Sequence, residues 1–166
     1  GGIGREVAKL GKAFGMRVTG IRRNPQDDEY ADEVLRLDRF EELLPLTDYL
    51  VLSLPDSSQT RNIINADILE KLNSSAMLIN VGRGTAINED DLTNALNDGK
   101  IAAAALDTTK VEPLDPNSSL WTTKNCFISA HDSAHSLLSL ERAFELFFQN
   151  IKNIQNGQPI KNLYSE

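Results

Sequence analysis

The sequence predicts an α/β protein built on a doubly wound parallel sheet with helices on both faces, and three observations support this fold class. Short apolar segments alternate with segments of helical spacing, which is the pattern of strand–helix–strand units. Residues 49–54 form a nearly continuous apolar run, as in a parallel strand buried on both faces. The chain opens on a glycine turn, Gly1 to Gly4, that leads directly into a helix, so we expect the sheet to be truncated at its first strand.

Each element is predicted from a local pattern. Ile3, Val7, Leu10 and Phe14 recur at helical spacing, and Gly15 is a typical residue for a helix end. Further helices are predicted at residues 40–44, 66–72 with Asn65 as N-cap, 88–97 with Asn88 as N-cap, and 137–155, and a polar helix start at 27–31. Strands are predicted at residues 16–21, 34–37, 49–54, 76–80, 101–106 and 126–129. The tail, residues 156–166, is polar.

Composition argues against several classes of function. The chain has 166 residues, which suits one domain, and 40% of them are hydrophobic. Its net charge of −7 argues against nucleic-acid binding, because phosphate backbones are bound by basic surfaces. A single cysteine, Cys126, leaves no intrachain disulfide and makes a reducing, cytoplasmic location the default. No apolar run approaches the roughly 20 residues of a membrane span, so no membrane partner is expected.

The glycine-rich opening is the first candidate binding site. Gly1, Gly2, Ile3 and Gly4 fit the last four positions of the dinucleotide-binding pattern G-x-G-x-x-G. The first of these glycines would let the backbone approach a pyrophosphate, and Gly4 would allow close packing of helix on strand. The helix N-terminus adds partial positive charge. The alternative is a plain turn into a helix.

The end of the next strand supports the dinucleotide interpretation. An acidic residue at this position would bind a ribose 2′-hydroxyl, whereas a nearby arginine accommodates a 2′-phosphate. Here the strand ends with Arg22, Arg23 and Asn24, and no acid is present. The sequence therefore predicts NADP as the preferred cofactor, with NAD as the second choice. The alternative is two solvated surface arginines.

Polar side chains follow three of the later strands. Arg83 lies between two glycines after the strand that ends at Asn80, Asp107 ends another strand, and His131 follows a third. Glu112 lies in the loop after Asp107. Because ligands of open α/β sheets bind at the carboxyl ends of the strands, these groups are candidates for one site. An arginine would orient an anionic substrate, and a histidine beside a carboxylate would exchange protons. Taken singly, each is more often a surface or structural residue.

Other kinds of site find little support. His131 and His135 are four residues apart, but no third ligand is evident nearby, so no metal site is predicted. Cys126 lies within a predicted strand and is expected to be a buried apolar residue. Neither a G-x-S-x-G nor a G-x-x-x-x-G-K-[ST] motif is present, which argues against a serine hydrolase and a P-loop protein.

Together these segments resemble the Rossmann-type coenzyme-binding domain of the D-isomer-specific 2-hydroxyacid dehydrogenases. This family includes glyoxylate/hydroxypyruvate reductases and phosphoglycerate dehydrogenase. The resemblance is carried by the glycine-rich segment 1–5, by residues 52–65, by residues 78–84 with Leu92, Ala95 and Leu96, and by residues 156–162. It covers nearly the whole chain, residues 1–166.

The resemblance implies a role for each candidate residue. Arg83 matches the arginine that binds the substrate carboxylate, and Glu112 matches the glutamate that pairs with the acid/base histidine, His131. Asp107 matches a contact to the nicotinamide carboxamide, while Pro55, Val81 and Gly82 match the cofactor site. The implied activity is hydride transfer between NAD(P) and C2 of a small 2-hydroxy or 2-oxo acid, by an oxidoreductase acting on a CH–OH group. The family also implies a homodimer.

Departures from the family pattern and alternatives to enzyme function are also visible. Thr108 to Val111 replace the family's usual Val-Phe, and Asp132 follows His131 where a small apolar residue is usual. The family's first strand and its N-terminal substrate domain have no counterpart in residues 1–166, so we expect the isolated chain to have little or no turnover. The alternatives are a dinucleotide-sensing, corepressor-like interaction module and a catalytically dead structural domain.

Overall fold

The computed structural model describes residues 1–163 and divides the chain into two compact units. The first unit is Gly1–His131 and the second is Asp132–Glu166, of which the last three residues lie outside the described part. The polar tail expected at residues 156–166 therefore extends beyond the described residues.

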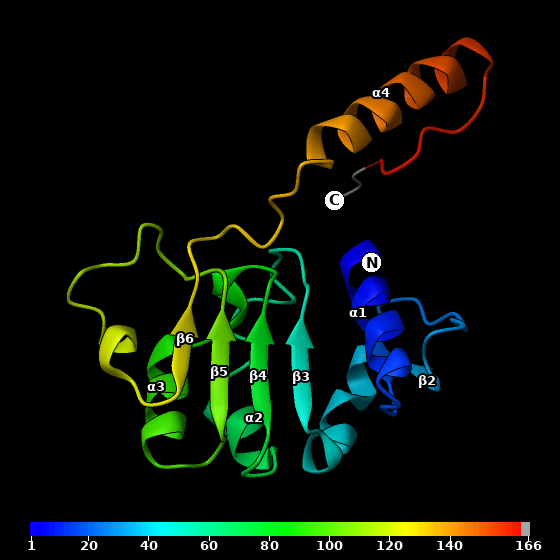
Figure 1. Ribbon diagram of the computed structural model, residues 1–166. Coiled ribbons are helices and arrows are strands. Elements are labelled where there is room, and N and C mark those ends of the chain that lie inside the picture. The colour runs from blue at the N-terminus through cyan, green and yellow to red at the C-terminus, as the bar shows by residue number, and fades with distance from the viewer. Residues whose placement is uncertain (164–166) are drawn as a thin grey trace. The chain divides into compact units, whose positions relative to one another are not determined.

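Every strand pairing that the structure shows is parallel, which confirms the predicted Rossmann-type α/β class. The helices of the first unit are α1 (Gly2–Ala13), α2 (Ala66–Lys71) and α3 (Glu89–Asn97), with 3-10 helices η1 (Leu37–Leu46), η2 (Gly84–Ala86) and η3 (Ser119–Thr122). The strands are β1 (Thr19–Ile21), β2 (Glu33–Leu35), β3 (Tyr49–Leu52), β4 (Met77–Asn80), β5 (Ala103–Leu106) and β6 (Cys126–Ile128). They form a pair, β1-β2, and a four-stranded sheet in the order β3-β4-β5-β6 (Figure 1).

Helices α2 and α3 pack on one face of the four-stranded sheet and enclose the core with it (Figure 1). The fully buried core residues include Leu44, Leu69, Leu78 and Leu92. Both predicted N-caps are confirmed. The Asn65 side chain accepts a hydrogen bond from the Ile68 amide of α2, and the Asn88 side chain accepts from two amides of α3. These caps fix where α2 and α3 begin.

Two local predictions were wrong, and a third, the helix at residues 40–44, was right in position but is of the 3-10 type. Residues 27–31 form a turn and not a helix start, because the Asp28 carboxylate accepts the Tyr30 amide and so competes with helical hydrogen bonding. Residues 40–44 are part of the 3-10 helix η1, which contains Pro45. Strand β3 ends at Leu52 and is not buried on both faces, since Tyr49 is 52% exposed and the next two residues are half-buried.

A hollow of about 1040 Å³ lies between the two sheets. It is lined by β1 on one side and by β3 on the other, and it is also lined by residues of α1 and η1. Each of the two strands pairs with one neighbour only, β1 with β2 and β3 with β4, among the residues that the structure describes. The parallel sheet of this unit is thus in two parts with open edges on either side of the hollow.

The second unit contains the long helix α4 (Ser139–Gln155). Phe144, Phe147 and Phe148 are each more than half exposed within it, and the ring of Phe148 contacts the other two rings. Within residues 1–163, no helix is both long and apolar enough to cross a membrane.

Candidate functional site

The strand order places the candidate residues along one edge of the four-stranded sheet. Since β3 to β6 are parallel neighbours, the segments that leave their carboxyl ends lie next to one another. Val81 follows β4 directly and its amide donates to the Leu52 carbonyl, so it continues the ladder between β3 and β4. Asp107 follows β5, and His131 follows β6 after two residues. The sheet therefore brings together groups that are far apart in sequence.

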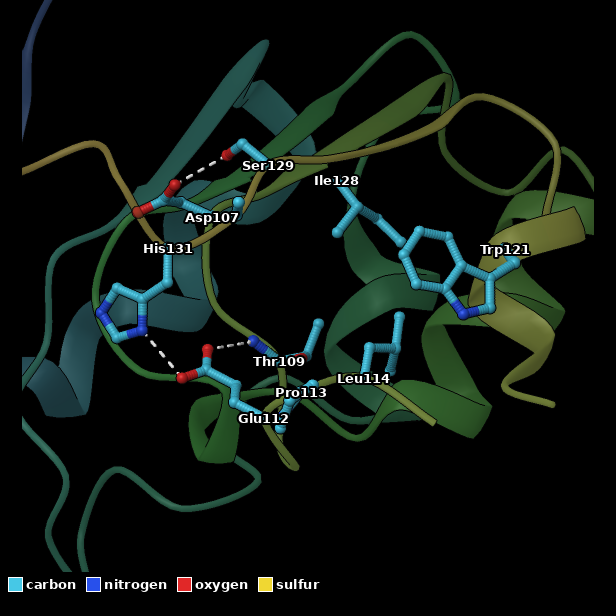
Figure 2. Close-up of a pocket in the computed structure, with 10 residues that line it drawn as sticks. Asp107, Thr109, Glu112, Pro113, Leu114, Trp121, Ile128, Ser129 and His131 are labelled. Carbon is cyan, nitrogen blue, oxygen red and sulfur yellow. Dashed lines mark hydrogen bonds and ion pairs between the residues drawn. The ribbon is translucent and has the colours of Figure 1, made fainter. Parts of the chain in front are cut away.

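Glu112 and His131 form a close pair at this edge. Glu112 Oε2 lies 2.8 Å from His131 Nδ1, and Glu112 Oε1 accepts the Thr109 amide at 3.1 Å (Figure 2). The hydrogen bond from His131, helped by the Thr109 amide and by the charge of Arg83, holds the pKa of Glu112 below its usual value. The carboxylate is therefore ionised at neutral pH and stabilises a protonated imidazole beside it.

The backbone of His131 has a φ of 56°, in the left-handed region that residues other than glycine rarely adopt. Such conformations cost energy and are often found where a side chain must be held in a particular direction. Here the imidazole is turned toward Glu112, and 45% of the His131 side chain remains exposed. The ring is thus held by its partner yet accessible to a ligand.

Asp107 is almost fully buried, at 5% exposure, and Ser129 Oγ donates to its Oδ1 at 2.7 Å (Figure 2). Asp107, Glu112 and His131 line one cavity of about 510 Å³, whose far wall is formed by Leu114 and Trp121. The three residues, which follow the two neighbouring strands β5 and β6, thus share one concave site with an apolar wall.

Arg83 is held in a loop that two glycines allow to pack closely. A β-carbon on Gly82 would lie 2.8 Å from the backbone of Leu54, and one on Gly84 would lie 2.0 Å from the backbone of Thr109. Arg83 is exposed, and its Nη1 donates to the Gly82 carbonyl at 2.8 Å. The positive charge of the guanidinium contributes to the lowered pKa of Glu112.

The predicted cofactor residues at the other end of the first unit meet in the hollow between β1 and β3. Gly1, Gly2, Gly4 and Arg22 all line it. A β-carbon on Gly4 would lie 3.1 Å from Ser53 Oγ, so α1 approaches the end of β3 closely. The glycines at the α1 N-terminus and the basic side chain of Arg22 therefore line the same hollow.

Several predicted cofactor residues are exposed or are held by neighbours. Arg23, Asn24 and Ile3 are exposed, as is Pro55, whose carbonyl accepts Thr60 Oγ1. The Arg22 amide donates to the Leu35 carbonyl and extends the β1-β2 pairing. Within residues 1–163, no cluster of three or more His, Cys, Asp or Glu side chains is arranged to hold a metal ion.

Sequence reasoning missed the residues that hold the site in place, which are Asn80, Thr109 and Ser129. Asn80 is buried and its side chain bonds to the loop of Arg83. The available signal was a polar residue at the end of an apolar strand, separated by one residue from Gly-Arg-Gly. Thr109 and Ser129 carry no such signal, because their partners lie in other segments of the chain.

A parallel sheet with a glycine turn at a helix start and charged groups along its carboxyl edge is the plan of a dinucleotide-binding α/β domain. Comparison with known proteins makes this class specific. The chain belongs to the D-isomer specific 2-hydroxyacid dehydrogenase family, since residues 1–133 match the model of that family's NAD binding domain. Residues 1–133 are therefore an NAD-binding domain of this family.

Relatives and solved structures agree with this assignment. The chain is 33% identical over 162 residues to a hydroxypyruvate reductase of Blautia hydrogenotrophica, with 96% of this chain and 49% of the relative covered. It is 39% identical over 132 residues to the human glyoxylate reductase/hydroxypyruvate reductase, with 79% and 40% covered. The NADPH-dependent glyoxylate/hydroxypyruvate reductase of Sinorhizobium meliloti, solved with NADP and sulfate, superposes with a TM-score of 0.89 at 29% identity, covering 99% and 53%. The chain thus spans about half the length of its relatives.

Proposed function

We propose that this chain is the coenzyme domain of an NADP-preferring reductase of small 2-oxo acids, acting in the cytoplasm as a homodimer. The observation that carries the proposal is the Glu112–His131 pair, with its 2.8 Å contact in the cavity that Asp107 lines and near the charge of Arg83. An ionised carboxylate, an imidazole and a guanidinium together suit proton exchange at an oxygen next to a substrate carboxylate.

Each residue has a distinct task in this proposal. Arg83 binds the substrate carboxylate through its fork of donors. Since Nδ1 of His131 faces Glu112, Nε2 is the nitrogen that gives a proton to the C2 oxygen during reduction and takes it back during oxidation. Glu112 keeps the imidazole oriented and stabilises its protonated form.

The residues present fit a dinucleotide. Gly1, Gly2 and Gly4 at the α1 N-terminus suit a pyrophosphate, Arg22 suits a 2′-phosphate, and buried Asp107 suits a carboxamide donor. When bound, a nicotinamide supplies or accepts the hydride at C2 of the acid. Relatives include glyoxylate and hydroxypyruvate reductases, so these two oxo acids are the first substrates to test.

We also propose that the chain works as one part of a longer protein. The hollow between β1 and β3 offers open edges for one further parallel strand, and the relatives are about twice as long as the chain. The isolated 166 residues should therefore turn over little substrate. Robust NADPH oxidation with glyoxylate or hydroxypyruvate by the isolated chain would contradict this proposal.

The experiment that separates an enzyme from a dinucleotide-sensing interaction module uses the complete protein that carries this chain. NADPH oxidation is measured with glyoxylate and with hydroxypyruvate, for the parent and for Arg83→Ala. We expect turnover by the parent and a loss of 100-fold or more in kcat/KM in the variant, because a charge-assisted bidentate contact disappears. Cofactor binding without turnover would favour the interaction module. Equal activity of parent and variant would mean that Arg83 does not take part in turnover, and it would favour a catalytically dead structural domain.

A further inference from the structure

Asn80 is a buried polar residue that the proposed chemistry does not use. It is the last residue of β4 and its exposure is 0%, in a strand whose other fully buried side chain is Leu78. A buried amide is costly unless its donors and acceptor are all satisfied. Its presence here therefore calls for a physical reason.

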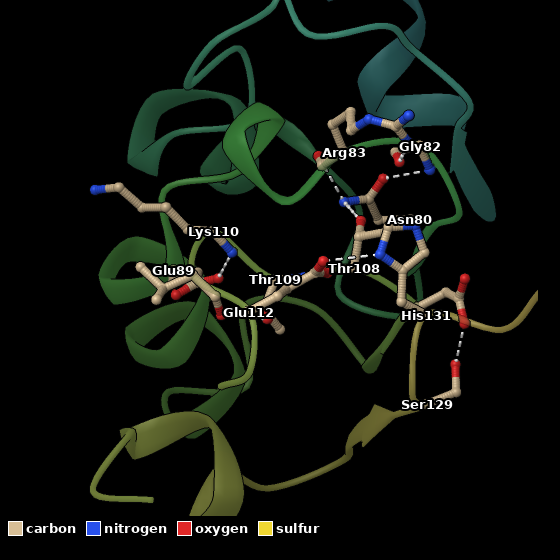
Figure 3. A network of polar contacts seen from close by, with 12 residues as sticks. Asn80, Gly82, Arg83, Glu89, Thr108, Thr109, Lys110, Glu112, Ser129 and His131 are labelled. Atoms are coloured by element: carbon tan, nitrogen blue, oxygen red, sulfur yellow. Dashed lines mark hydrogen bonds and ion pairs between the residues drawn. The ribbon is translucent and has the colours of Figure 1, made fainter. Parts of the chain in front are cut away.

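The Asn80 side chain makes three hydrogen bonds, which engage its carbonyl and its NH2 group (Figure 3). Oδ1 accepts the Gly82 amide at 3.0 Å, which closes a turn between a side chain and the backbone two residues on. Nδ2 donates to the Arg83 carbonyl at 3.0 Å and to Thr108 Oγ1 at 3.3 Å. The amide thus binds the Arg83 loop and a residue of the neighbouring strand end at the same time.

The two segments that Asn80 joins carry the opposite halves of the candidate site. Thr108 is 3% exposed, and its neighbour Thr109 donates its amide to Glu112 Oε1 at 3.1 Å. A continuous path of hydrogen bonds and covalent links therefore runs from the Arg83 backbone through Asn80 to the carboxylate that holds His131 (Figure 3). The other side of the Arg83 loop is closely packed, since a β-carbon on Gly84 would overlap the Thr109 backbone.

We propose that Asn80 is a positioning residue, which fixes the spacing between the substrate-binding Arg83 and the Glu112–His131 pair. This inference rests on the proposed function. A displacement of about 1 Å in a reacting constellation can cost on the order of 100-fold in rate. Asn80 touches no substrate in this account, and its effect passes through Arg83.

The test replaces Asn80 by aspartate in the complete protein. Asn80→Asp keeps the size of the side chain but directs an oxygen, in place of the NH2 group, at the Arg83 carbonyl. We expect kcat/KM for glyoxylate or hydroxypyruvate to fall 10- to 100-fold, while the dissociation constant of NADPH changes less than threefold. The matched control is Asn73→Asp. Asn73 precedes the start of β4, and its Nδ2 also donates to a backbone carbonyl, that of Thr47. The control should keep parental kcat/KM.

A double-mutant cycle distinguishes positioning from a general loss of structure. If Asn80 acts through the guanidinium, Asn80→Asp should lower kcat/KM less than twofold when added to Arg83→Lys. The proposal would be overturned if Asn80→Asp lowered kcat/KM by the same factor in the Arg83→Lys variant as in the parent. It would also be overturned if the Asn80→Asp enzyme kept parental kcat/KM. If Asn80→Asp does not fold, Thr108→Val decides, because it removes only the hydrogen bond from Asn80 to the segment that follows β5. We then expect a 3- to 10-fold lower kcat/KM, and parental kcat/KM in Thr108→Val would overturn the proposal.

The two proposals fail in different ways. A complete protein that binds NADPH but reduces no 2-oxo acid contradicts the proposed function and, with it, the role of Asn80. A complete protein that reduces the acid equally well with and without the Asn80 amide contradicts the positioning role alone.

Discussion

Glu112 and His131 lie 19 residues apart in sequence, and their side chains meet with 2.8 Å between Oε2 and Nδ1. The second carboxylate oxygen is held by the Thr109 amide, so the carboxylate cannot turn away freely. Since the hydrogen bond from His131 lowers the pKa of Glu112, the carboxylate is ionised at neutral pH. The negative charge of Glu112 is lost as the pH falls through its lowered pKa, below the ordinary carboxyl range.

The charge of Glu112 predicts a pH effect. Glu112→Gln keeps the shape of the side chain but removes the negative charge that stabilises protonated imidazole. Reduction of an oxo acid needs that proton, so the alkaline limb of the pH profile should move to lower pH in Glu112→Gln. The measurement is kcat against pH from 5 to about 10 for both proteins. Identical profiles would show that Glu112 does not support the proton donor.

Arg22 predicts cofactor preference. Arg22→Ala should weaken NADPH binding about 10-fold or more and leave NADH binding nearly unchanged, because only NADPH carries a 2′-phosphate. Dissociation constants for both cofactors are measured by titration of the complete protein. Arg39→Ala serves as the control, since Arg39 is exposed and pairs with Glu42. Tighter binding of NADH than NADPH by the parent would refute the NADP preference.

The close packing of Gly84 against Thr109 predicts an effect on stability. A β-carbon there would lie 2.0 Å from the Thr109 carbonyl carbon, so Gly84→Ala must push two strand-end loops apart. We expect a loss of about 1–3 kcal/mol in the free energy of unfolding, seen as a Tm several degrees lower. Gly20→Ala is the matched control, because its β-carbon would meet the Val34 side chain at an ordinary 3.6 Å. Equal Tm values for the two variants would mean that the Gly84 loop is not closely packed.

Cys126 predicts low thiol reactivity. Burial raises the pKa of Cys126 from 9.0 to about 11, so at pH 8 the folded protein holds about 100-fold less thiolate at this residue than the unfolded chain. Iodoacetamide should therefore modify the Cys126 peptide far more slowly in the native protein than in urea, as followed by mass spectrometry. Modification at equal rates would show that the β6 edge opens readily.

The sequence was most informative where one residue controls a local structure. Asn65 and Asn88 predicted the starts of α2 and α3, and glycines on both sides of Arg83 predicted a tight loop at a strand end. Strand ends with Arg83, Asp107 and His131 could be predicted to share an edge because parallel strands place them there.

Tertiary contacts decided the rest. The Asp28 carboxylate bonds the Tyr30 amide and pairs with Arg5, which turned a predicted helix start into a turn. The apolar run at residues 49–54 did not become a doubly buried strand, because β3 borders the hollow and has a neighbour on one side only among the described residues. The hydrogen bond from Ser129 to Asp107 joins segments 22 residues apart, which no local pattern predicts.

The most direct test of the central claim concerns His131. NADPH oxidation with glyoxylate and hydroxypyruvate is measured for the complete protein and for His131→Ala, and NADPH binding is titrated in both. We predict turnover by the parent, a loss on the order of 100- to 10,000-fold in the variant, and NADPH dissociation constants within about threefold of each other. Parental turnover in His131→Ala would contradict the assignment of the Glu112–His131 pair as the proton-transfer site.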